Sequence, residues 1–214
     1  MLRDTAVTLI KGRLANNKLS GLDALIVAEM VLFQAVVMEG DRTKFWFLET
    51  LDKTLATVVD QDTLDLADAA NYLTETDRGG FWWVDSDGNR NEIRRGDYDD
   101  MVELYGSDTG SPKRYAIVGS TVYLFPTPDD VYTIWHLHYS REDSLESANI
   151  ENAWLKYAPD WMIGGVGEII ARQYNNDEKM AQKFSEQAQQ ARARLVTEHT
   201  AREEANRLRL NEVV

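Results

Sequence analysis

The sequence predicts an α+β protein in which a helical bundle frame surrounds a β-rich insertion. Apolar residues recur at three- and four-residue spacing at both ends of the chain, and they alternate with polar residues in the middle third. No repeat or proline-rich linker separates these regions. We therefore expect one structural unit, made of N-terminal helices over 1–41, the insertion over 42–140 and C-terminal helices over 141–214.

Two helices are expected at the N-terminus. The first covers 4–15, where Ala6, Leu9 and Ile10 recur at helical spacing. The second begins at Ser20, because a serine hydroxyl accepts hydrogen bonds from the unpaired amides of a helix N-terminus. Asp23 adds a negative charge at the positive end of the helix dipole, and 39–41 ends the helix.

Strands are expected wherever aromatic and β-branched residues cluster at short spacing. These segments are 44–48, 54–59, 81–84, 92–93, 115–118, 122–125 and 132–139. The Asp87-Gly88 pair predicts a hairpin turn over 85–89, since such a turn needs positive φ. Asp97 is placed to cap a short helix over 97–105.

The C-terminal third returns to helical spacing. A short helix or turn is expected over 152–157, and Pro159 is well placed at the first position of a helix that continues to Tyr174. One long helix then covers 177 to about 212. At ~1.5 Å per residue it would reach roughly 54 Å, which is longer than a small domain is wide.

The composition excludes several kinds of site. The chain has no cysteine, so a disulfide framework, a thiolate zinc site and a cysteine nucleophile are excluded. The formal net charge is −13, with 36 acidic and 23 basic residues. Because such a surface repels phosphate, we do not expect a free-standing nucleic-acid-binding protein.

A membrane or secreted location is not expected either. The most apolar stretch, 24–38, contains Glu29 and Gln34 and is shorter than the ~20 residues of a membrane span. An acid, Asp4, stands where a signal peptide needs basic residues. We expect a soluble protein that stays in the compartment where it is made.

Three motifs resemble ligand sites and lack a required member. The loop that begins at Asp85 has no glycine at the sixth position of a calcium loop and no glutamate at the twelfth. His136 and His138 share one strand face without an evident third ligand, which favours a polar strand face over a zinc site. The glycines at 164, 165 and 167 lack the dinucleotide pattern, which favours close packing of a neighbouring helix. We therefore predict no catalytic, cofactor or metal site, and no enzyme.

The tryptophans Trp46, Trp82, Trp83 and Trp135 are open to two interpretations. In strands they are expected to pack in a core. On a surface they would form a sugar-binding platform, which keeps a carbohydrate-binding or carbohydrate-cleaving module as an alternative function.

The end of the long helix is the most informative feature for function. Past Leu195 its apolar residues become sparse and arginines become frequent. A solvated tail is one interpretation. We favour an arm, from about Thr197, that docks on another chain. The residues predicted to make its contacts are Arg202, Arg207, Leu208, Arg209 and Leu210.

A set of turn and strand motifs stands in the middle of the chain, at 71–73, 81–85, 97–100, 112–119 and 124–129, and is followed by the Pro159 helix with 173–177. Together these segments resemble the adaptor proteins of tailed-phage head-to-tail connectors. The order of helices and strands also agrees with that family. The chain departs from the family pattern at 136–139, where a more aromatic strand end is expected.

The resemblance implies a structural role in the virion, at the head-to-tail junction, for a protein made in the host cytoplasm. It implies a ring of neighbouring subunits, commonly twelve, fixed below the portal protein. Such a ring extends the DNA channel without sequence-specific binding and presents a platform to tail or nozzle proteins. The arm would then dock on the portal or on a neighbouring subunit, with the portal as our first hypothesis.

Overall fold

The chain forms a mixed α+β structure, as predicted. A computed structural model describes residues 1–14, 21–69, 71–76, 80–146 and 150–211, with the backbone alone described at Asp68 and 206–211. The expected cap at Ser20 lies outside the described residues. The chain divides into two compact units, which we call unit 1 (Met1–Phe47 and Glu142–Val214) and unit 2 (Leu48–Arg141).

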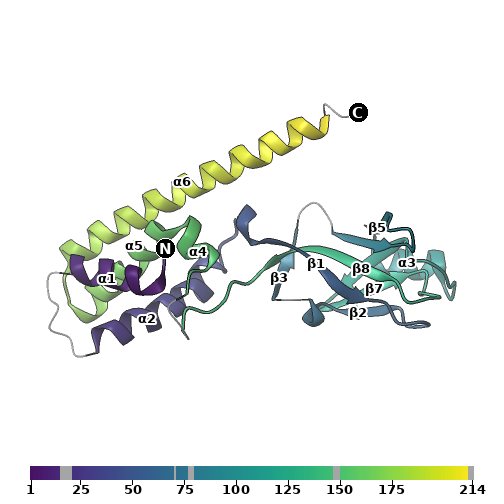
Figure 1. The fold of residues 1–214 in the computed structure, drawn as a ribbon, viewed down its shortest axis with the longest axis horizontal. Helices are drawn as coiled ribbons and strands as arrows, with labels where there is room; N and C mark the ends of the chain where they lie inside the picture. Colours follow the sequence, from purple (N-terminus) through teal and green to yellow (C-terminus); the bar gives the residue numbers. More distant parts are fainter. Residues whose placement is uncertain (15–20, 70, 77–79, 147–149, 212–214) are drawn as a thin grey trace. The chain divides into compact units, whose positions relative to one another are not determined.

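Unit 1 is helical (Figure 1). Its helices are α1 (Arg3–Arg13), α2 (Leu22–Leu32), α4 (Ala153–Tyr157), α5 (Pro159–Ile169) and α6 (Glu178–Asn211). Helix α2 continues as a π-helix, η1 (Phe33–Met38), and α5 continues as another, η4 (Ile170–Tyr174). Asn152 caps α4 by accepting a hydrogen bond from the Leu155 amide at 3.0 Å. Asp177 does the same for α6 with the Met180 amide at 3.0 Å.

The core of unit 1 corrects one predicted strand. Residues 44–48 contain a 3₁₀ turn, η2 (Trp46–Leu48), instead. Phe45 is completely buried and meets Trp154 and Trp161 edge-on, with ring centroids 6.0 and 6.1 Å apart. Because strand propensity largely reflects how a side chain packs, these helical partners outweigh the aromatic pattern.

Unit 2 is a curled sheet with one helix, α3 (Tyr98–Tyr105). The described strands are β1 (Glu49–Ala56), β2 (Thr63–Asp65), β3 (Tyr72–Glu75), β4 (Phe81–Val84), β5 (Arg90–Arg95), β6 (Arg114–Val118), β7 (Thr121–Phe125) and β8 (Thr133–Ser140). A 3₁₀ turn, η3 (Leu66–Asp68), follows β2. Strand β1 starts earlier than the predicted 54–59, and Val58 and Val59 lie beyond its end, exposed.

Strand β8 is central to the sheet. The order is β1-β8-β4-β5-β6-β7-β2, and β3 also pairs with β8. All pairs are antiparallel except β5 with β6, which are parallel and joined through α3. The predicted hairpin between β4 and β5 is present, with Gly88 at φ 83°, and so is the predicted cap of α3 by Asp97. The buried face carries Leu55, Phe81, Ile93, Tyr115, Val122, Leu124 and Ile134.

Candidate functional site

The Asp85 carboxylate closes a turn. Its Oδ1 accepts hydrogen bonds from the amides of Asp87 (3.0 Å) and Asn89 (2.8 Å), and its Oδ2 accepts one from the Asn89 side chain (3.1 Å). The Asn89 side-chain bond is the main cause that lowers the pKa of Asp85. The carboxylate therefore serves the β4–β5 turn. Among the described residues, no group of three or more His, Asp or Glu side chains is arranged to hold a metal ion.

The two histidines of β8 lie on one face of the strand, but the prediction of a polar face is wrong. His136 and His138 are completely buried. The His136 ring stacks on Phe81, with centroids 4.0 Å and planes 9° apart, and on His138, with centroids 4.7 Å apart. Both point to the inner face of the curled sheet, so alternation along β8 buries them with Ile134.

A glutamate from β3 explains how a histidine is accommodated there. Glu75 Oε1 lies 2.9 Å from His136 Nε2, and the Glu75 side chain is 15% exposed. Glu75 is also hydrogen-bonded to Tyr72. Burial is the main cause that raises the pKa of Tyr72 to about 12, and the charge of Glu75 adds to it. Because Glu75 is 61 residues from His136 in the chain, no local pattern reveals this pair.

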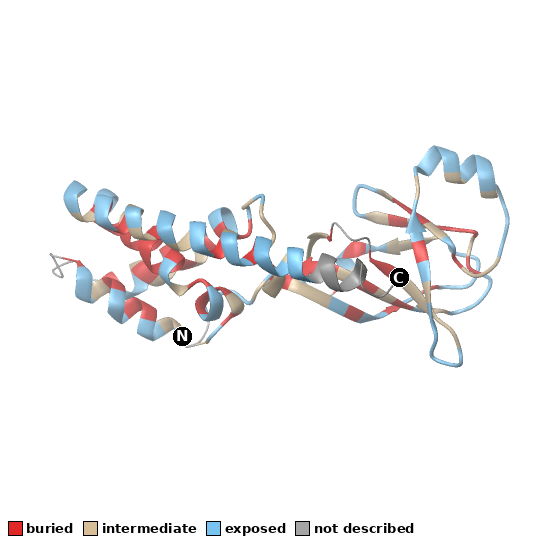
Figure 2. Ribbon diagram, turned by 90° about the horizontal axis from the view of Figure 1, so that it is seen from above, coloured by how far each residue is buried: buried red, intermediate tan, exposed pale blue. Residues whose placement is uncertain are grey.

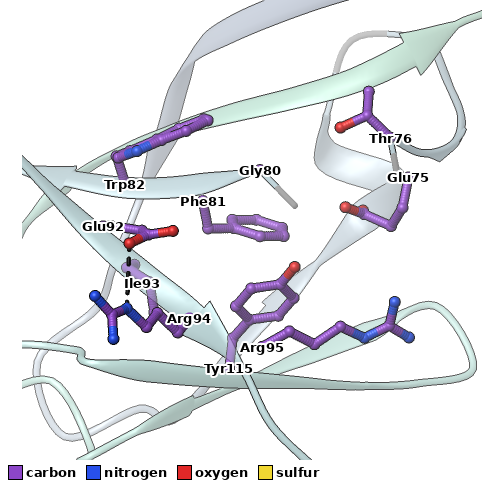
Figure 3. A pocket seen from close by; sticks show the side chains of 10 residues that line it. All are labelled: Glu75, Thr76, Gly80, Phe81, Trp82, Glu92, Ile93, Arg94, Arg95 and Tyr115. Carbon is purple, nitrogen blue, oxygen red and sulfur yellow. Dashed lines mark hydrogen bonds and ion pairs between the residues drawn. The ribbon is translucent and has the colours of Figure 1, made fainter. Parts of the chain in front are cut away.

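A cavity of about 430 Å³ opens beside this pair (Figure 3). It is lined by Glu75, Thr76, Gly80, Phe81, Trp82, Glu92, Ile93, Arg94, Arg95 and Tyr115. Burial raises the pKa of the Tyr115 phenol, and Glu92 is hydrogen-bonded to Arg94 at 3.2 Å. Figure 3 shows the Tyr115 hydroxyl below the Phe81 ring and the Glu75 carboxylate beside it. The lining draws on β3, β4, β5 and β6, so the cavity lies where these strands meet.

The tryptophans do not form an open sugar platform. Trp82 and Trp135 face each other across β4 and β8. The ring of Trp135 is covered by Lys53, whose Nζ lies 4.2 Å from its centroid, and by Arg90 at 5.5 Å. Trp83 packs on Tyr132 at the sheet core. The expectation that all four lie in strands is wrong for Trp46, which lies in η2.

The glycines of α5 allow neighbouring helices to pack closely, which confirms the interpretation that the sequence favoured. A Cβ atom on Gly164 would lie 2.7 Å from the Ala188 amide nitrogen of α6. One on Gly165 would lie 2.0 Å from the Phe33 ring. Each glycine therefore allows an approach that no larger residue permits.

The first part of the predicted arm packs on unit 1 of its own chain. The prediction that the docking segment begins at about Thr197 is therefore wrong. His199 is only 8% exposed and stacks on Trp46, with centroids 6.2 Å apart. The Arg202 guanidinium lies 4.4 Å from the centroid of the same indole and donates to Glu198 at 2.7 Å. Beyond this point the described part of α6 is largely exposed (Figure 2). The side chains of Arg207, Leu208, Arg209 and Leu210 are outside the described residues.

One exposed surface was missed by the sequence reasoning. We call it the α2 face, and it consists of Ala24, Val27, Ala28, Val31 and Leu32 of α2 and Val36 of η1. Leu32 is 56% exposed and Val36 is 69% exposed. The signal was the long apolar stretch at 24–38, which is apolar on all sides and is not fully buried.

A search of curated proteins finds no match. None of the described helices is both long enough and apolar enough to span a bilayer. The family model described as SU10 adaptor protein matches residues 8–211, nearly the whole chain. The chain therefore belongs to the SU10 adaptor protein family, a family of phage head-to-tail adaptors.

Proposed function

We propose that this protein is a structural, non-catalytic component of the phage head-to-tail junction. Its copies form a ring, by family resemblance of twelve subunits, below the portal protein. The ring extends the DNA channel and offers an attachment platform to tail or nozzle proteins. The observation that carries the proposal is the family match over residues 8–211.

The charge of the chain supports a channel role. Each copy has a formal charge of −13, so twelve copies carry twelve times that, about −156. An acidic lumen repels the phosphate backbone and lets DNA slide. In the acidic stretch 60–77, Asp60 and Asp65 are exposed, whereas Glu75 is turned into the sheet and drops out of the proposed lining. Asp77 lies outside the described residues.

The end of α6 supports docking on another chain. The helix extends to Asn211, beyond the contact between Arg202 and Trp46. We assign the docking contacts mainly to Arg207, Leu208, Arg209 and Leu210. Arg202 stays at the margin of this contact, because Trp46 and Glu198 already hold its guanidinium.

The proposal is tested by the mass of the purified chain, alone and mixed with the portal protein. We expect a ring, or a ring bound to the portal. A chain that stays monomeric and does not bind the portal would refute the proposal. Tight binding of free duplex DNA at physiological salt would refute the repelling channel, because that binding needs bases that neutralise phosphate.

A charge-reversal pair tests the docking segment. Arg207→Glu with Arg209→Glu should weaken assembly. Lys183→Glu with Arg194→Glu is the control, because both are exposed basic residues of the same helix and the double variant undergoes the same total charge change. Equal effects of the two variants would show that net charge, and not the docking segment, controls assembly.

A further inference from the structure

Helix α2 is apolar on its exposed side as well as on its buried side, where Leu22, Ile26 and Met30 pack into the core of unit 1. Its acid Glu29 is buried, at 9% exposure, and accepts a hydrogen bond from the Tyr174 hydroxyl at 2.9 Å. The α2 face, in contrast, is apolar and exposed to solvent. A surface helix normally buries the apolar side and exposes the charged one. The arrangement indicates a surface that another protein covers.

The α2 face forms a groove with an acidic rim. The groove has a volume of about 340 Å³, and Glu146 completes a lining that is otherwise made of α2 residues. Glu146 is exposed. Asp23 stands at the N-terminal end of the same helix, where Lys11 pairs with it at 2.8 Å. A segment that binds this groove should present an apolar face to it and carry basic side chains beside that face.

The same chain carries a segment with that chemistry. In the sequence, Ala201, Ala205 and Leu208 follow at the spacing of one helical face, beside Arg207 and Arg209. The backbone is helical to Asn211, and Ala205 is exposed. No α6 residue is in the groove lining, and α5 lies between α2 and α6 within unit 1 (Figure 1). The chain therefore has an exposed apolar groove with Glu146 on its rim, and a helix end whose sequence combines apolar and basic residues.

We propose that the α2 face of one copy binds the last turns of α6 from a second copy. Leu208 enters the groove together with Ala205 of the same helical face, and Arg207 and Arg209, on either side of Leu208, lie toward its rim. This is recognition of a helix in a groove. A contact between two different surfaces of identical chains is head-to-tail, and it closes into a ring when the rotation permits. The inference rests on the proposed ring and names the contact between its subunits.

Two full-length variants test the two sides of the contact. In the face variant, Leu32→Glu and Val36→Glu place charges on the α2 face. In the arm variant, Ala205→Glu and Leu208→Glu place charges on the face of the helix end that enters the groove. Leu104→Glu with Val118→Glu is the matched control, because both side chains are exposed apolar residues of unit 2, 65% and 50% exposed. Circular dichroism checks that each variant is folded.

Sedimentation equilibrium measures self-association. We expect the wild type and the control to associate, and the face and arm variants each to associate at least tenfold more weakly. An equimolar mixture of the two variants should form a one-to-one dimer, because one intact groove and one intact arm remain. A mixture that stays monomeric overturns the inference, and so does a monomeric wild type or a variant that associates like the wild type.

Portal binding by the wild type is measured in parallel. Loss of portal binding counts against the proposed function. A monomeric mixture of variants, alongside a wild type that still binds the portal, counts against this contact alone.

Discussion

Gly164→Ala adds one methyl group at the contact between α5 and α6. The new Cβ would lie 2.7 Å from the Ala188 nitrogen, 2.9 Å from its Cα and 2.9 Å from the Phe184 carbonyl oxygen. All three are backbone atoms, so no rotamer change relieves the contact. To reach ordinary contact at 3.4 Å, α6 must move from the 2.7 Å position by about 0.7 Å.

The expected cost follows from two opposing effects. Overpacking a core costs ~1–3 kcal/mol, and a contact with backbone belongs at the upper end of that range. Replacing glycine by alanine inside a helix returns up to ~1 kcal/mol of helix propensity. The net loss in the free energy of unfolding is therefore about 2 kcal/mol, or a Tm lower by roughly 4–8 °C for a chain of this size.

Gly12→Ala provides the matched control. Gly12 lies in α1, and a Cβ there meets nothing within 4 Å. The same chemical change should stabilise the protein by up to ~1 kcal/mol. Urea unfolding followed by the helical signal at 222 nm compares the two variants. If Gly164→Ala stabilises as much as Gly12→Ala, the close approach of α5 and α6 is wrong.

Tyr72→Phe should flatten part of the alkaline loss of stability. The pKa of Tyr72 is raised to about 12 from 10.0, mainly by burial, so the folded chain keeps a proton that the unfolded chain releases. The free energy of unfolding of the wild type should therefore fall as pH rises from about 10 to 12. Urea titrations measure this dependence, and an equally steep fall in Tyr72→Phe would contradict the explanation. Asp41→Asn should cost about 1 kcal/mol at pH 7, because the half-exposed Arg192 pairs with this carboxylate at 2.6 Å. Burial acts to raise the pKa of Asp41, but hydrogen bonds outweigh burial and lower it. The ionised Asp41 therefore stabilises the fold above about pH 4, and this stabilisation is lost on acidification. If Asp41→Asn lowers the free energy of unfolding as much at pH 2 as at pH 7, this explanation is wrong. Deletion from Thr197 onward should lower the Tm, because it removes the buried His199. Deletion after Glu203 should leave the Tm unchanged. Equal Tm values for the two truncated chains would argue against the packing of α6 on η2.

Local signals in the sequence predicted local structure well. Asp97 caps α3 and the Asp87-Gly88 turn joins β4 to β5, because each depends on a few adjacent residues. The strand expected at 44–48 was wrong, since Phe45 packs on residues more than 100 positions away. The burial of His136 likewise depends on Glu75, which a pattern within β8 does not contain.

The candidate interface was predicted less completely than the fold. Residue spacing indicated the long helix and its basic end. The point where α6 stops packing depends on Trp46, about 150 residues earlier, which stacks on His199 and Arg202. The apolar pattern of 24–38 indicated a helix, but no pattern within one helix tells which of its apolar sides lacks a covering neighbour.

The pairing of β1 with β8 determines where the chain enters and leaves unit 2. Unit 2 begins one residue before β1 and ends one residue after β8, and Glu49 is the register partner of Tyr139. Opposed residues in antiparallel strands are ~4.5–5.5 Å apart, so the chain enters and leaves unit 2 at nearly one point. An insertion with adjoining ends is readily exchanged. Because Leu48 and Arg141 lie beside paired strand ends, a connection of different length between Phe47 and Glu142 would not change the order of the helices in unit 1.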